Sequence, residues 1–216
     1  LWVGTAGGGL NKFNEQSKTF TSYQHDPDDP LTISNNRIWS VSSDEKGNLW
    51  VATSNGLNYF YVNSEKFIRY LPDKNDPSSI SHAQVRTTFI DKKGQLYAGT
   101  AMALDRYNPG TGDFTHFFAF EKGTEPNSVN KIYEDRNGTM WVGTHIGGLA
   151  VFNRDKGTFK YYTHDPRNKN TISYNDVRDI YEDRSGILWV STRGGGLNKL
   201  DLKPPKFKHF TPFSKK

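Results

Sequence analysis

The sequence contains one five-residue phrase five times, as LWVGT at residues 1–5, LWVAT at 49–53, LYAGT at 96–100, MWVGT at 140–144 and LWVST at 188–192. The start positions 1, 49, 96, 140 and 188 lie 48, 47, 44 and 48 residues apart. Self-similarity at such a period is typical of a repeat protein. Each phrase is a run of apolar, mostly aromatic and β-branched residues, which favours a buried strand over a helix. We therefore expect one structural unit for each phrase.

Three further short runs accompany each phrase. Glycines separate the phrase from a second apolar run, such as GGLNKF at residues 8–13, and two strands split by glycines form a hairpin. A third run has aromatic residues near its ends, such as Phe20 and Tyr23. A fourth run ends at an Asp-x-x-Gly turn, such as Asp44 and Gly47, where aspartate bonds its own backbone and glycine accepts positive φ. The sequence predicts four strands and no helix in each unit.

A unit of four short antiparallel strands is the blade of a β-propeller. We therefore predict an all-β fold, a partial β-propeller of about five four-stranded blades over residues 1–210, whose second strands begin at residues 1, 49, 96, 140 and 188. Residues 211–216 are expected to be a tail or the start of the next loop between blades. This register implies four full blades and one without its innermost strand, as in a piece of a longer protein. We expect a ring larger than five blades, with five as the alternative.

The aromatic residues of the phrases are expected between blades, as core: Trp2, Trp50, Tyr97, Trp141 and Trp189. A partial ring exposes strand edges and blade faces, which predicts association with further blades or with a second copy of the chain. Only 34% of the residues are hydrophobic, which fits a core spread thinly between blades.

The composition excludes several kinds of site. The absence of cysteine excludes disulfides, thiolate catalysis and cysteine-ligated zinc. The net charge is +5, but part of the excess lies in the tail KPPKFKHFTPFSKK at residues 203–216, and no recognition motif accompanies it, so we expect no nucleic acid as partner. The segments HDPDDP at residues 25–30 and HDPRNK at 164–169 recur at matching places, which favours a turn over a metal site. We expect neither a metal nor a cofactor.

Ligand contacts are expected where the repeats differ, because the fold needs the same residue in every blade whereas one ligand breaks the symmetry. Two places ring the central opening of a propeller: the start of the first strand and the residue after the phrase threonine. An aromatic face suits a pyranose ring, and guanidinium groups hold carboxylate or sulfate. The predicted ligand-binding residues in these irregular columns are Arg37, Trp39, Arg86, Asn130, His145, Arg178 and Arg193.

The repeat as a whole, N-x-[VI]-x-x-[IV]-x-x-D-x-x-G-x-[LM]-W-V-G-T-x-G-G-L-x-x-[FY], resembles the two-component regulator propeller over essentially the whole chain. The third copy departs from it, with Tyr97 and Ala98 for Trp-Val, AMA at residues 101–103 for the glycine pair, and a loop at 121–127 about four residues short. In Bacteroidetes such repeats form the extracytoplasmic sensor of hybrid two-component systems. The resemblance implies a periplasmic sensor region of an inner-membrane protein that recognises a glycan-derived oligosaccharide. It also implies a homodimeric receptor whose membrane helix and histidine kinase lie outside this region.

Two other classes of function stay open. A propeller glycosidase would need two unmatched carboxylates about 5–10 Å apart, and a lyase is a second enzyme class to consider. Asp176 and Asp179 are the acidic candidates, and both lie at one strand start. A protein-interaction scaffold of the WD-repeat kind would carry Gly-His and Trp-Asp dipeptides, which are missing at the expected points. We expect a sensing module with no catalytic residue in this region.

Overall fold

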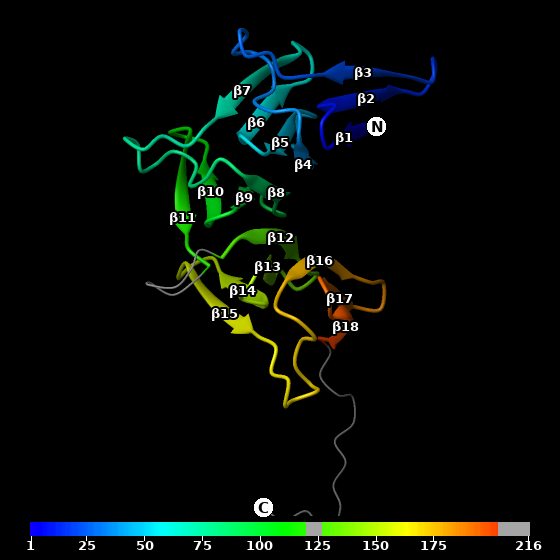
Figure 1. The fold of residues 1–216 in the computed structure, drawn as a ribbon, viewed down its shortest axis with the longest axis vertical. Helices are drawn as coiled ribbons and strands as arrows, with labels where there is room; N and C mark the ends of the chain where they lie inside the picture. Colours follow the sequence, from blue (N-terminus) through cyan, green and yellow to red (C-terminus); the bar gives the residue numbers. More distant parts are fainter. Residues whose placement is uncertain (120–126, 203–216) are drawn as a thin grey trace, which may run out of the picture.

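The computed structural model describes residues 1–119 and 127–202, and these residues form strands and turns without a helix. No described segment is therefore a helix of the length and hydropathy that a bilayer crossing requires. The strands form five antiparallel sheets of three or four strands, one after another in chain order (Figure 1). Each sheet is one blade, and we number the blades 1 to 5 from the N-terminus. The all-β propeller fold predicted from the sequence is confirmed.

The blades contain the following strands. Blade 1 is made of β1 (Trp2–Gly4), β2 (Leu10–Asn14) and β3 (Thr19–Tyr23). Blade 2 is made of β4 (Ile38–Ser43), β5 (Leu49–Thr53), β6 (Gly56–Tyr61) and β7 (Lys66–Tyr70). Blade 3 is made of β8 (Val85–Ile90), β9 (Leu96–Thr100), β10 (Leu104–Asn108) and β11 (Asp113–Phe117). Blade 4 is made of β12 (Val129–Glu134), β13 (Met140–Thr144), β14 (Leu149–Asn153) and β15 (Thr158–Tyr162). Blade 5 is made of β16 (Val177–Glu182), β17 (Ile187–Thr192) and β18 (Gly196–Asp201).

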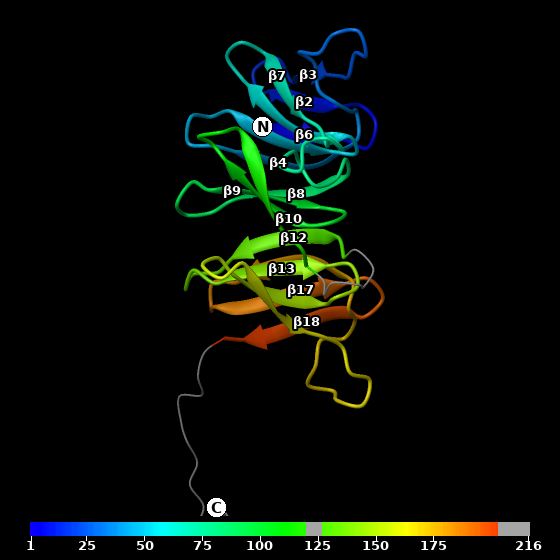
Figure 2. The same ribbon diagram turned by 90° about the vertical axis from the view of Figure 1, so that its left-hand side faces the viewer.

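The blades follow one another along an arc. In Figure 1 the outer strands β3, β7, β11 and β15 trace the arc, and the first strands β4, β8, β12 and β16 lie on its concave side. Neighbouring first strands contact one another, and each also contacts the second strand of the preceding blade. Figure 2 shows the blades stacked in chain order from β2 and β3 at one end to β18 at the other. The last part of the predicted propeller at residues 203–210, the expected tail at 211–216 and most of the loop at 121–127 lie outside the described residues.

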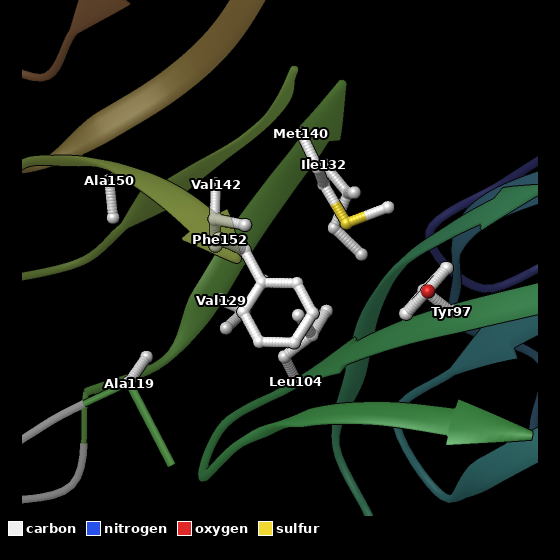
Figure 3. Close-up of a cluster of buried hydrophobic side chains, with 9 residues drawn as sticks. All are labelled: Tyr97, Leu104, Ala119, Val129, Ile132, Met140, Val142, Ala150 and Phe152. Atoms are coloured by element: carbon white, nitrogen blue, oxygen red, sulfur yellow. The ribbon is translucent and has the colours of Figure 1, made fainter. Parts of the chain in front are cut away.

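The hydrophobic core is divided into four clusters, one at each junction between consecutive blades. Figure 3 shows the cluster between blades 3 and 4, where Phe152 of β14 lies near Leu104 of β10, with Tyr97 on the blade 3 side. Trp2, Trp50 and Trp141 take part in the other three clusters. The predicted position between blades is therefore confirmed for the four phrase aromatics that precede another described blade.

A small residue at the fourth position of the phrase allows the next blade to approach closely. A Cβ atom added to Gly143 would lie 2.6 Å from the Cγ1 atom of Val177, on the first strand of blade 5. A Cβ atom added to Gly99 would lie 2.6 Å from the Cγ1 atom of Val129. These distances are shorter than real side chains show, so one of the two elements would have to move. The close approach therefore requires glycine at Gly99 and Gly143, whereas the junction after blade 2 accommodates the single methyl group of Ala52.

The outer face of blade 5 has the apolar residues of a junction but no described blade beyond it. Leu197 is 63% exposed, whereas the leucine at the same place in blade 2, Leu57, is fully buried. Tyr181 of β16 is 59% exposed, and Trp189 is half-buried. The burial of β17 alternates because its other face packs on blade 4.

We predict that Gly143→Val lowers the free energy of unfolding by about 1–3 kcal/mol, because the added methyl groups enter the occupied junction. Ser191 holds the same position of the phrase in blade 5, where no described blade follows. The matched change Ser191→Val should therefore alter the free energy of unfolding by no more than about 0.5 kcal/mol. Urea unfolding of the two variants and the wild type measures the difference. Equal losses for both variants would contradict this role of the glycine.

Candidate functional site

Every first strand has a β-bulge at the same position. In blade 2 the ladder pairs Ile38 with Thr53 and then Ser40 with Ala52, so Trp39 is left without a partner in the second strand. The same register shift occurs in β8, β12 and β16. A bulge bends the strand and changes the direction of the unpaired side chain. The four bulge residues were all predicted as ligand-binding residues from the irregular column of the repeat: Trp39, Arg86, Asn130 and Arg178.

Asp176 connects three of the predicted residues. Its side chain is almost fully buried, and its Oδ2 atom accepts a hydrogen bond of 2.7 Å from Nη2 of Arg178. Its Oδ1 atom accepts a hydrogen bond of 3.2 Å from Nδ2 of Asn130, which also donates to the carbonyl oxygen of Val177. The Nδ1 atom of His145 lies 3.2 Å from Asp176 Oδ2 but has no hydrogen-bonding geometry with any described residue. The imidazole ring and the carboxylate are therefore close to each other without a hydrogen bond between them.

Arg86 extends this network into blade 3. Its Nη1 atom donates a hydrogen bond of 2.7 Å to Oδ1 of Asn130 in blade 4. Burial lowers the pKa of Arg86 below its ordinary value, and the nearby charge of Arg178 acts in the same direction while Asp176 opposes it. The Nε atom of Arg86 is buried and has no hydrogen-bond partner among the described residues. A bound acceptor group at this place would therefore satisfy a cation that the protein alone leaves under-satisfied.

A cavity of about 750 Å³ opens between blades 4 and 5 beside Asp176. This volume is in the range of sites that hold small-molecule ligands. The backbone N–H of Arg193 donates a hydrogen bond of 2.8 Å to the carbonyl oxygen of Asp176, and the Arg193 side chain is exposed. Tyr174 is 51% exposed. The cavity is lined by His145, Ile146, His164, Tyr174, Asn175, Asp176, Arg193 and Gly194.

Arg37 and Trp39 form a second group in blade 2. The indole N–H of Trp39 donates a hydrogen bond of 2.9 Å to Oγ of Ser54, the residue that follows the phrase threonine. The guanidinium carbon of Arg37 lies 5.1 Å from the centre of the Trp39 ring, and 45% of Trp39 is exposed. No hydrogen bond or ion pair within residues 1–119 and 127–202 joins this group to Asp176. The predicted residues therefore lie in two groups, one in blade 2 and one around Asp176.

Several residues of the site were not in the predicted set. Asp176 belongs to an irregular column with Arg37, Gln84 and Ser128, so the same comparison of repeats could have included it. Tyr174 likewise occupies a column that varies from blade to blade. The inter-blade contacts of these residues are not visible in a comparison of repeats, because that comparison shows which positions vary but not which side chains meet.

We predict that Asp176→Ala lowers the free energy of unfolding by about 1–3 kcal/mol, because it removes the acceptor of the Arg178 and Asn130 hydrogen bonds at a buried place. Asp179 provides a matched control, since its carboxylate is 62% exposed and lies 2.7 Å from Nζ of Lys131. Loss of an exposed pair changes stability by less than about 1 kcal/mol, so Asp179→Ala should be nearly neutral. Chemical denaturation of both variants tests the prediction, and a neutral Asp176→Ala would disprove it.

Comparison with known proteins supports the interpretation of the repeat. Residues 32–55 and 171–194 match the family described as two-component regulator propeller. Each match covers the first strand, the Asp-x-x-Gly turn and the phrase of one blade. The chain carries two-component regulator propeller repeats. Residues 44–147 also match the SMP-30/gluconolactonase/LRE-like region. No curated protein matches the sequence.

Solved structures give the same result over a longer range. The extracellular domain assigned to a hybrid two-component system of Bacteroides thetaiotaomicron is 27% identical, with a TM-score of 0.77 over 92% of this chain and 25% of that chain. A second such domain from this organism is 26% identical, with a TM-score of 0.65 over 94% of this chain and 32% of that chain. The chain thus spans between a quarter and a third of these structures. Virginiamycin B lyase from Staphylococcus aureus, at 13% identity and a TM-score of 0.62 over 96% of this chain and 67% of that chain, shares the fold alone.

Proposed function

We propose that this chain is the ligand-binding part of the periplasmic sensor domain of a hybrid two-component system, and that its ligand is an oligosaccharide with carboxylate or sulfate groups. The proposal rests on the excess of positively charged side chains at and around the bulge positions of blades 3 to 5. Arg86, Arg178 and Arg193 lie around one buried carboxylate, that of Asp176, with His145 beside it. Cations in excess of anions favour an anionic ligand, and guanidinium groups suit planar oxyanions.

The aromatic groups support a sugar as the carrier of the charge. Trp39 and Tyr174 are both about half exposed. They lie at opposite ends of the proposed ligand site, Trp39 in blade 2 and Tyr174 beside blade 5. Amphipathic rings of this kind offer an apolar face to a pyranose and a polar edge to its hydroxyl groups. The similarity to extracellular domains of hybrid two-component systems supports a sensing role. The histidine kinase that would receive the signal lies outside this chain.

Binding rather than catalysis fits the acidic residues best. Asp176 accepts a hydrogen bond of 2.7 Å from Arg178, and Asp179 forms a pair of 2.7 Å with Lys131. A glycosidase would need one of two carboxylates as a proton donor and the other as a base or nucleophile. Because both carboxylates are engaged by cations, we assign them the role of orienting the basic residues.

We predict that the chain binds heparin-derived or polygalacturonate-derived hexasaccharides, and that Trp39→Ala and Arg193→Ala each weaken binding about tenfold or more while the fold is kept. Neutral maltohexaose should bind weakly or not at all. Affinity should fall as ionic strength rises, because the contacts involve exposed charges. Isothermal titration calorimetry measures the affinities, and circular dichroism verifies the fold.

Arg184 provides the control, because it is an exposed arginine on the Asp-x-x-Gly turn of blade 5, at the opposite end of the first strand. Arg184→Ala removes the same charge and should leave binding within about twofold of wild type. Wild-type affinity in both Trp39→Ala and Arg193→Ala would refute the assignment of the site. Equal affinity for maltohexaose and the charged hexasaccharides would refute the class of ligand.

A further inference from the structure

A second cavity lies between blades 2 and 3, on the face that carries the Asp-x-x-Gly turns. Its volume is about 460 Å³, and Asp44 of one turn and Gly94 of the next both line it. The bulge residues lie at the other end of the first strands, so this cavity is separate from the proposed anion site. Its aromatic lining consists of Trp50, Tyr59, Tyr61, Tyr70 and Tyr107, and Lys46, Gln95 and Pro109 also line it.

Blade 2 departs from the repeat at two positions of its third strand, and both residues line the cavity. Tyr59 is paired with Trp50, where the other blades have Lys12, Arg106, Val151 and Lys199. Tyr61 stands where three other blades have asparagine, and in blades 1 and 4 that asparagine side chain accepts hydrogen bonds from the backbone of the following turn. Blade 2 has therefore lost a turn cap and gained an aromatic ring. Two such departures on one strand, both facing one cavity, have the asymmetry expected of a ligand site.

The tyrosines form a connected aromatic surface with an exposed end. The ring of Tyr59 lies 4.7 Å from that of Trp50, and its hydroxyl group donates a hydrogen bond of 2.6 Å to Asp44, which fixes the ring. Burial raises the pKa of Tyr59 to about 12, and the hydrogen bond to Asp44 adds to the shift, so this group stays protonated at neutral pH. Tyr61 packs edge-on against Tyr59 at 4.8 Å and is 41% exposed.

The cavity has hydrogen-bond donors that the described residues leave free. The hydroxyl groups of Tyr70 and Tyr107 lie 3.1 Å apart, and only one of the two hydrogens can be used within the pair. The second hydroxyl hydrogen of this pair has no acceptor among the described residues. The same holds for the hydroxyl group of Tyr61 and the ammonium group of Lys46. The Asp44 carboxylate is already engaged, because it accepts bonds from Tyr59 and from the backbone of its own turn.

The geometry points to a proline-rich peptide in the extended polyproline II conformation as the ligand of this cavity. Such a segment has carbonyl acceptors that its own backbone leaves unbonded, and its prolines lack N–H donors. Its carbonyl groups can therefore accept hydrogen bonds from the free O–H and N–H donors of the cavity, such as the hydroxyl group of Tyr61 and the ammonium group of Lys46. Proline rings pack against aromatic side chains, and aromatic-lined grooves are the usual receptors for this conformation.

Fluorescein-labelled decaproline tests the inference directly, with a labelled Gly-Ser peptide of equal length as the negative probe. The chain should bind decaproline saturably in fluorescence anisotropy and should not bind the Gly-Ser peptide. Tyr61→Asn should weaken decaproline binding about tenfold or more. This variant restores the residue that caps the turn in blades 1 and 4, so the fold should be kept. Tyr162→Asn is the matched control, since Tyr162 is 40% exposed in blade 4 and lies outside this cavity, and it should bind as the wild type does.

Three results would overturn the inference. The first is the absence of saturable decaproline binding to the wild-type chain. The second is equal affinity of the wild type and Tyr61→Asn. The third is binding of neutral maltoheptaose that Tyr61→Asn abolishes while decaproline stays unbound, which would assign the cavity to a saccharide. None of these results depends on the proposed anion site, because no residue of that site is changed.

Discussion

The close packing of each first strand on the phrase of the preceding blade is the constraint on which the structure depends. Val177 packs where a side chain at Gly143 would stand, Val129 does the same at Gly99, and Ile38 at Gly4. This contact determines how near two blades come, and the phrase aromatic next to it fills the rest of the junction. Because the contact recurs in successive blades, the residue that follows each packed valine or isoleucine lies at an equivalent place on the concave side of the arc, whatever its type.

The bulge separates the residue that the fold constrains from the residue that it leaves free. Val177 is fully buried, whereas the adjacent Arg178 stands outside the ladder of backbone hydrogen bonds and is exposed. A residue outside the ladder can be tryptophan, arginine or asparagine without disturbing the pairing of the strands on either side. The residue at the bulge position can therefore change at little cost in stability. This explains why the core position before it is always valine or isoleucine, whereas the bulge position differs from blade to blade.

The repeat predicted the strands well because packing between blades imposes the same pattern on each copy. The phrase strand, the glycine-separated second strand and the Asp-x-x-Gly turn each depend on residues that are close together in the sequence. The sequence alone therefore indicates them. The bulges were not predicted, although the three-residue spacing of the apolar positions in the repeat, such as Ile38 and Val41, breaks the two-residue alternation of a regular strand. The role of Asp176 was not predicted either, since its partners Asn130 and Arg178 come from two blades. The tyrosine-lined cavity was missed because the comparison of repeats was applied to the first and second strands and not to the third, where Tyr59 and Tyr61 depart from it.

The polar network at the bulge position joins the blades that contribute residues to the proposed ligand site. Arg86 of blade 3 bonds Asn130 of blade 4, and Asn130 bonds Asp176 of blade 5, so two junctions share one chain of hydrogen bonds. A ligand acceptor that competes with Asp176 for the amide group of Asn130 would exchange a contact between blades 4 and 5 for a contact with ligand. Binding shifts a conformational equilibrium only through a difference in affinity between two arrangements, and an exchange of this kind supplies such a difference. The buried carboxylate thus holds the basic residues in place without ligand, and its loss of a partner is the physical event by which a bound oligosaccharide would alter the junctions that the phrase glycines hold together.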